Sequence, residues 1–170
     1  MSLMLRAAAA ALVCVMLAAC AATSAVESQS KPHSAQSARI YVVRPGAWSG
    51  AALGVAVRVN DAEVGSVANN SYLFVDRPPG RYKIELSAMG ALGNLEHEAQ
   101  VGAGRTYYLA YNAGPAVTTL PGGIPLVIPG PTGGRQVGQA NFLAGAYLAE
   151  LDATAGAEVV ARMKAREARR

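Results

Sequence analysis

The sequence has few of the residues from which cross-linked scaffolds and active sites are built. It contains only two cysteines, Cys14 and Cys20, and two histidines, His33 and His97, among 170 residues. Two cysteines near the N-terminus give no disulfide framework, and no His/Cys group has the spacing of a zinc site. Charged residues make up 15% of the chain and aromatic residues 6%, so a largely aliphatic core has to stabilise the fold.

Motifs of common enzyme classes are also missing. There is no Gly-x-Ser-x-Gly nucleophile elbow, and the glycine-rich segments lack the Gly-Lys-Ser/Thr ending that holds nucleotide phosphates. His97 lies between Glu96 and Glu98 on an expected strand, where alternation puts the histidine and the glutamates on opposite faces. Tyr107 and Tyr111 are expected to share a face of another strand and to pack in the core. We therefore predict no enzyme activity and no cofactor.

The first twenty residues indicate where the protein is located. Arg6 precedes an apolar run that ends in Leu17-Ala18-Ala19-Cys20. A basic start, a short apolar run and small residues are typical of a secretory signal, and the run is too short for a comfortable membrane span. Its last four residues resemble the lipobox of bacterial lipoproteins. The resemblance implies removal of residues 1–19 and lipidation of Cys20 by acyl chains such as palmitate.

The same resemblance implies which membrane holds the protein. In lipoproteins of this type an Asp after the cysteine retains the protein at the inner membrane, whereas this chain has Ala21. We therefore expect the cell outer membrane, with the body facing the periplasm and several acyl chains on Cys20 as a permanent anchor. The alternative is an uncleaved helix in the inner membrane.

A short segment rich in small and polar residues follows the cysteine. Residues 21–38 show no apolar periodicity, and such a segment buries too little apolar surface to offset the entropy lost on ordering. Residues 20–38 are therefore predicted to be the lipidated cysteine and a flexible tether, which would reach about 60 Å when fully extended.

From position 39 the sequence changes to short strands separated by turns. β-Branched and aromatic residues fill Ile40–Arg44, and valine recurs at every second position in Val55–Val59. Further strands are expected at 63–67, 72–75, 81–88, 95–101 and 105–111. Many short strands with frequent turns predict a mainly β fold, a single antiparallel β-sandwich over residues 39–151.

Residue types at three turns support this reading. Asn60 and Asp61 tolerate left-handed geometry and would form a tight hairpin. Pro79 and Gly80 fit a type II turn with a positive φ at the glycine. Residues 102–104, Gly-Ala-Gly, would join the last two of these strands.

Three motifs carry a further resemblance: Tyr41-Val42-Val43-Arg44-Pro45, Val57-Arg58-Val59-Asn60-Asp61 with Gly65, and Pro79-Gly80-Arg81-Tyr82. The region from Arg39 to Tyr111 resembles a family of uncharacterised bacterial lipoprotein domains. More distantly it is similar to the PEGA domains, which are small β-sandwiches of bacterial surface proteins. The resemblance implies a β-sandwich domain of unknown function. It implies no activity, because the family has none established.

Glycine and proline are concentrated in residues 112–141. A loop of this length inside a compact domain is typically functional or disordered. One interpretation is a short edge strand over 126–128 that lies on the sandwich. The other is a tip that contacts a partner or the membrane, and its apolar candidates are Ile124, Leu126, Val127 and Ile128.

The last part of the chain combines a strand and a helix. Residues 142–151 fit either element, and we expect a strand from about 146 to 151. Asp152 or Thr154 is suited to cap a helix within residues 152–170 that ends near 168. Its expected apolar stripe consists of Val159, Val160 and Met163.

Most of the net charge lies in this helix. Residues 162–170 carry five basic groups and one acidic group, whereas residues 20–161 carry nine basic and ten acidic groups. The basic end could contact anionic lipid or another acidic envelope polymer, or it could be a solvated end whose cations suit a helix C-terminus. Nucleic acid is not expected as a partner of a secreted, lipid-bound chain.

These observations lead to one functional hypothesis and one alternative. We expect an outer-membrane lipoprotein whose periplasmic domain is a binding or structural module of the cell envelope, with an envelope protein as partner. The alternative is an envelope enzyme or ligand carrier with an unrecognised site.

Overall fold

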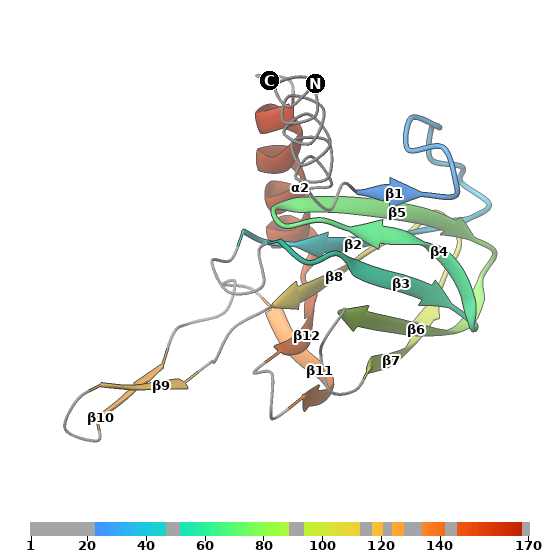
Figure 1. Cartoon of the computed structure of the whole chain (residues 1–170). Helices are drawn as coiled ribbons and strands as arrows, with labels where there is room; N and C mark the ends of the chain where they lie inside the picture. Colours follow the sequence, from blue (N-terminus) through green and yellow to red (C-terminus); the bar gives the residue numbers. More distant parts are fainter. Residues whose placement is uncertain are drawn as a thin grey trace, which may run out of the picture.

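Two five-stranded sheets pack face to face, and one helix covers the outer face of the second sheet (Figure 1). The computed structural model describes residues 23–46, 52–88, 94–112, 117–120, 124–127, 134–141 and 146–167. The prediction of a mainly β fold with two packed sheets and a C-terminal helix is confirmed.

The first sheet, sheet A, is antiparallel throughout and has the order β1-β4-β3-β6-β7. Its strands are β1 Ser24–Ala25, β4 Ala62–Val67, β3 Val55–Val59, β6 Gly80–Ala88 and β7 Leu95–Val101. In β3, the valines at 55, 57 and 59 are buried, whereas Arg58 is exposed. This alternation gives sheet A an apolar inner face and a polar outer face.

The second sheet, sheet B, has the order β11-β12-β8-β2-β5. Its strands are β11 Gly134–Asn141, β12 Ala146–Leu151, β8 Thr106–Asn112, β2 Ala38–Arg44 and β5 Ser71–Arg77. β2 and β8 pair in parallel, and the other neighbours are antiparallel. Sheet B is therefore mixed. The chain enters β8 by a crossover from β7 of sheet A, so no hairpin with β2 forces β8 to run antiparallel to it.

The aliphatic core lies between the two sheets and is called here the inter-sheet core. Ile40 and Val42 of β2, Leu73 of β5 and Ile84 and Leu86 of β6 are all almost completely buried in it. Every residue of β2 is buried, because sheet A covers one face of this strand and the helix covers the other.

Helix α2 (Ala153–Glu167) begins at the predicted cap. Asp152 Oδ1 accepts hydrogen bonds from the backbone N–H groups of Thr154 and Ala155, at 3.0 and 2.8 Å. The bonds satisfy two of the donors that a helix N-terminus leaves free. The predicted apolar stripe is buried against sheet B.

A second buried layer, the helix layer, lies between sheet B and α2. It contains Tyr41, Phe74 and Tyr108, together with Val159, Val160 and Met163 of the helix. The rings of Tyr41 and Tyr108 stack with centroids 5.2 Å apart. Gly156 lets the helix approach, because a Cβ there would lie 2.7 Å from Tyr108 Cβ and closer still to the ring.

The hairpin predicted at Asn60 and Asp61 is confirmed, since both residues are left-handed, with φ values of 49° and 64°. At residues 102–104, for which the sequence predicts only a connection between two strands, Gly104 has a φ of 68°. The type II turn with a positive φ at Gly80 is wrong. Gly80 already pairs with Val101 in the ladder of β6 and β7, so it is the first residue of a strand and has extended backbone.

The glycine- and proline-rich segment differs from its prediction. The edge strand expected over 126–128 on the sandwich is wrong for residues 126–127, because among the described strands β10 (Ile124–Val127) pairs with β9 (Val117–Leu120) and with neither sheet. Figure 1 draws this hairpin apart from both sheets. The apolar run follows a Pro-Gly-Gly sequence, which favours a return of the chain on itself. β11 also lies in the segment expected to be a loop.

Candidate functional site

The segment expected to be a free tether is bound to the sandwich. In β1, Ser24 lies opposite Ser66 and Ala25 lies opposite Gly65 in β4. The backbone N–H of Val26 donates to Val64 O at 3.0 Å. The expectation of a flexible tether is thus corrected for residues 23–37. Backbone pairing with a sheet edge holds this segment, and composition does not reveal such pairing.

Gly65 provides the space that β1 occupies. Its φ is +142°, and a Cβ at this position would lie 2.9 Å from Ala25 Cα and closer still to Ser24 O. Real Cβ atoms do not approach backbone so closely, so a side chain at position 65 would displace β1. The glycine of the hairpin motif therefore has a docking role in this fold.

Gln29 covers the open edge of β5. Its Nε2 donates to Phe74 O at 2.9 Å, and the backbone N–H of Phe74 donates to Gln29 Oε1 at 2.7 Å. The side-chain amide therefore satisfies one donor and one acceptor that a neighbouring strand would otherwise pair. An edge strand protected in this way is less available for pairing with other chains.

Charged side chains attach the same segment to β5: Glu27, Lys31, Arg39, Asp76 and Arg77. Arg39 donates to both carboxylate oxygens of Asp76 at 2.8 and 2.9 Å, and to Lys31 O at 3.0 Å. The hydrogen bond from Arg39 lowers the pKa of Asp76. Burial acts to raise the pKa of Glu27, but hydrogen bonds from Lys31 and Arg77 outweigh it and leave that pKa lowered.

Thr23 also attaches the N-terminal segment to this edge. Its hydroxyl is hydrogen-bonded to Ser71 Oγ at the start of β5, and the backbone N–H of Ala68 donates to Thr23 Oγ1 at 3.1 Å. Cys20, the predicted lipidation site, lies outside the described residues. It precedes Thr23 by three residues, a chain length that spans at most about 10 Å.

The candidate partner residues Ile124, Leu126 and Val127 lie on β10, and Ile128 lies outside the described residues. Ile124 pairs with Leu120, and Val127 pairs with Val117. An isolated two-stranded hairpin is marginally stable in water, so this hairpin is a candidate contact surface.

The other candidate residues, His97, Tyr107 and Tyr111, lie on strands and pack toward the inter-sheet core. His97 is half-buried on the inner face of β7, and Glu96 and Glu98 are exposed on the outer face, as predicted. Burial lowers the pKa of His97. Tyr107 and Tyr111 both pack in the inter-sheet core, which confirms their shared face.

Arg44 is a buried cation that the sequence reasoning did not single out. It ends β2 with 2% exposure, and its guanidinium donates to Leu53 O and, at 3.4 Å, to Val67 O. Its guanidinium carbon lies 5.7 Å from the centre of the Tyr111 ring. Burial lowers the pKa of Arg44. The side chain closes one end of the inter-sheet core with hydrogen bonds to backbone carbonyls.

Two further observations concern metals and membranes. Among the residues that the structure describes, no cluster of three or more His, Cys, Asp or Glu side chains is arranged to hold a metal ion. None of the helices in the described part of the chain combines the length and the apolarity needed to cross a bilayer.

Comparison with known proteins identifies a domain. A family described as "Protein of unknown function (DUF2846)" matches residues 34–123, more than half of the chain. The matched region runs from the residues before β2 to those after β9, and so leaves β1, β10, the strands β11 and β12 of sheet B, and α2 outside. No curated protein matches the chain.

Proposed function

The chain belongs to the DUF2846 family, and we propose that this member is a lipid-anchored lipoprotein of the bacterial cell envelope. In this proposal Cys20 carries the lipid, the outer membrane holds it, and the sandwich faces the periplasm. The domain acts as a binding or structural module, without catalysis. Its two-sheet architecture agrees with the small sandwich domains, PEGA domains among them, that the sequence resembles.

The observation that carries the proposal is that only two residues separate Cys20 from Thr23, which is hydrogen-bonded to the folded body. Residues that resemble a lipobox end at Cys20, and the chain is seated on the sandwich from Thr23 onward. Acyl chains on Cys20 would hold the domain within about 10 Å of the bilayer. Such an arrangement suits a module that works at the membrane surface.

The proposed partner contact is the β9–β10 hairpin. In the part of the chain that the structure describes, its two strands pair with each other and with no other strand, and the sequence of β10 contains Ile124, Leu126 and Val127. Burial of these residues by an envelope protein would add the apolar area that a lone hairpin lacks.

Replacement of Cys20 tests the anchor. Cys20→Ser is expected to keep residues 1–19 and to carry no acyl chain, and intact mass of the protein from cells measures both. Cys14→Ser is the matched control, because it removes the other thiol and leaves the expected processing site unchanged. A Cys20→Ser protein that is processed normally and stays bound to the membrane would contradict the proposal.

Crosslinking in the same cells tests the partner contact. The double variant Ile124→Ser/Leu126→Ser is expected to lose the crosslinked product, while circular dichroism of the purified protein stays unchanged. Thr118→Ser on the paired strand is the control. A crosslinked product of undiminished yield in the double variant would exclude the hairpin as the contact.

A further inference from the structure

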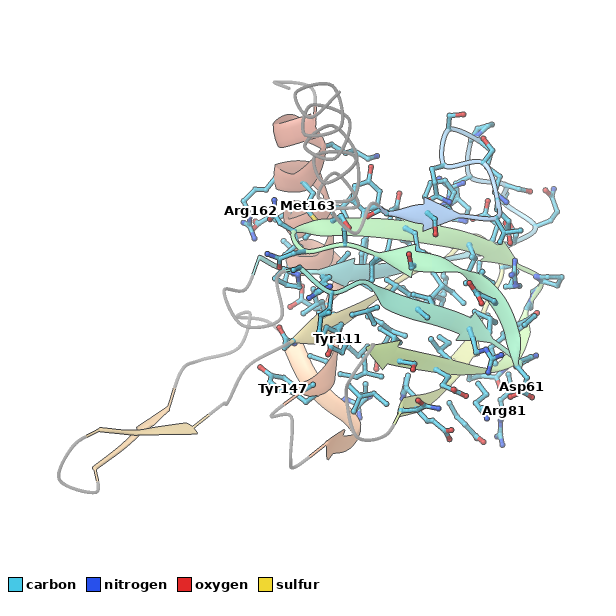
Figure 2. All side chains as sticks on the ribbon, in the orientation of Figure 1. Asp61, Arg81, Tyr111, Tyr147, Arg162 and Met163 are labelled. Atoms are coloured by element: carbon cyan, nitrogen blue, oxygen red, sulfur yellow. The ribbon has the colours of Figure 1, made fainter. Side chains whose placement is uncertain are left out.

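The end of α2 reaches the edge of sheet B. Near the start of the helix, Gly156 packs on Tyr108 of β8. Two turns later, Lys164 Nζ lies 5.9 Å from the centre of the Tyr72 ring in β5. The helix therefore crosses the sheet from an inner strand to its edge strand, and its last residues extend past β5. Figure 2 places Arg162 and Met163 on this side of the molecule, at the opposite side from Asp61.

The N-terminal segment lies along the same edge strand. Thr23 is hydrogen-bonded to Ser71, and Tyr72 is the next residue of β5. Thr23 and Lys164 are therefore both placed at the start of β5, although Ser71 and Tyr72 point to opposite faces of the sheet. Figure 1 shows β1 and β5 along one side of the sandwich, with α2 rising past them. We call this side the β1/β5 edge.

Among the described residues near this edge, Arg162 and Lys164 of α2 are exposed basic side chains. In the sequence, residues 158–170 carry five basic groups and two acidic groups, a net charge of +3. One of the acidic groups is Glu158, which lies 3.8 Å from Arg162 and offsets its charge. The acidic residues on the same edge, Glu27 and Asp76, already pair with Lys31, Arg39 and Arg77.

We propose that the basic end of α2 contacts anionic phospholipid headgroups and that the β1/β5 edge faces the bilayer. The inference rests on the proposed lipid anchor at Cys20. That anchor keeps the helix end within about one Debye length of the surface. There each Lys or Arg strengthens the association with an anionic surface about fivefold. The acyl chains supply proximity, and the charges select the orientation.

This orientation separates two surfaces of the molecule. Figure 1 draws the β9–β10 hairpin away from the β1/β5 edge. With that edge on the bilayer, the hairpin points away from the lipid and stays accessible to a protein. The helix end and the hairpin therefore have different partners, and each can be altered without the other.

A dye placed on α2 tests the orientation. In the mature lipoprotein Cys20 would carry lipid, so Ala161→Cys on the exposed side of the helix would provide the single free thiol. The labelled lipoprotein is reconstituted into vesicles of phosphatidylcholine, with or without phosphatidylglycerol, that contain a quencher on the lipid headgroup. We expect stronger quenching with phosphatidylglycerol, and we expect high salt to abolish the difference.

Charge variants identify the residues responsible. The triple variant Arg162→Gln/Lys164→Gln/Arg166→Gln is expected to lower the ratio of docked to undocked helix by at least about tenfold. The matched control removes the same charge from exposed arginines elsewhere, as Arg58→Gln/Arg81→Gln/Arg105→Gln, and should keep the response. Arg162→Lys/Arg166→Lys retains the charge and should also keep it, which separates loss of charge from loss of fold.

Two results would overturn the inference: equal quenching in both kinds of vesicle, or an undiminished response in the triple variant. Failure of the lipid anchor is distinguished from failure of the orientation by the experiment in cells. If the anchor proposal is wrong, the Cys20→Ser protein is processed and membrane-bound in cells, whatever the quenching in vesicles. If only the orientation fails, the anchor test in cells still succeeds while the dye is insensitive to phosphatidylglycerol.

Discussion

The inter-sheet core and the helix layer are built from different side chains. The inter-sheet core consists mostly of valine, leucine and isoleucine, which two facing sheets contribute. In the helix layer, three aromatic rings of sheet B, those of Tyr41, Phe74 and Tyr108, pack under a single helix. The first layer tolerates many arrangements of similar aliphatic residues, whereas the second depends on the shapes of particular rings.

The rims of the two layers also differ. At the rim of the helix layer, the Arg39 guanidinium lies 3.9 Å from the centre of the Phe74 ring and forms a bidentate pair with Asp76. At one end of the inter-sheet core, Arg44 bonds to backbone carbonyls. Protonation of a carboxylate should therefore affect the helix layer more than the inter-sheet core, and this difference can be tested.

The largest effect is expected in the inter-sheet core. Leu73 is completely buried there, and Leu73→Ala should lower the free energy of unfolding by about 3 kcal/mol, because it removes apolar contacts and leaves a cavity. Denaturant unfolding measures the loss. Glu96→Ala on the exposed face of sheet A is the control and should change stability by less than about 0.5 kcal/mol. A loss below about 1 kcal/mol for Leu73→Ala would mean that this core repacks easily.

A smaller effect is expected from Gly156→Ala. The new Cβ overlaps Tyr108, so the helix has to move away from sheet B at a cost of about 2 kcal/mol. Near-ultraviolet circular dichroism of the tyrosines reports the change in the helix layer. Ala157→Gly, at the neighbouring exposed position, is the control and should leave that signal unchanged. Tyr108→Ala in the Gly156→Ala background should relieve the overlap, and an unaltered spectrum for Gly156→Ala alone would contradict the close approach.

The smallest effect is expected at the rim of the helix layer and depends on pH. The pKa of Asp76 is lowered in the folded state by the hydrogen bond from Arg39. Its stabilisation is therefore complete above the unfolded-state pKa, near 4, and disappears as the pH falls through the folded-state pKa. Asp76→Asn should cost about 1 kcal/mol at pH 7 and progressively less below about pH 4. Denaturant unfolding across this pH range measures the difference.

The control for Asp76 is Glu98→Gln, which removes a carboxylate on the exposed outer face of sheet A. It should change stability by less than about 0.5 kcal/mol at pH 7. A cost for Asp76→Asn that stayed constant down to pH 2 would show that the ion pair does not stabilise the fold through its charge.

Sequence periodicity predicted the individual elements well. Alternation identified the buried valines of β3 and the opposite faces of His97 and its neighbouring glutamates in β7, and Asp152 identified the start of α2. The left-handed residues Asn60 and Asp61 identified a hairpin. These signals are local, because each depends on the conformation of a residue or on the direction of side chains a few positions apart.

The elements that were missed depend on partners distant in the chain. β1 looks polar by composition and is held by the backbone of β4 and by the space over Gly65. Gln29 looks like a linker residue and pairs with the backbone of Phe74. For the candidate site, the sequence indicated Cys20 and the apolar residues of β10, but it did not indicate that the N-terminal segment and the helix end both lie against β5.

The sequence by itself determined the strands between residues 39 and 111, the hairpin at Asn60 and Asp61 and the start of α2 after Asp152, since those preferences arise between near neighbours. Only the tertiary structure decided the parallel pairing of β2 with β8, the docking of residues 23–37 and the convergence of Thr23 and Lys164 on β5. These arrangements depend on contacts between residues that lie tens of positions apart. Such contacts form only when the sheets assemble, so no local pattern records them.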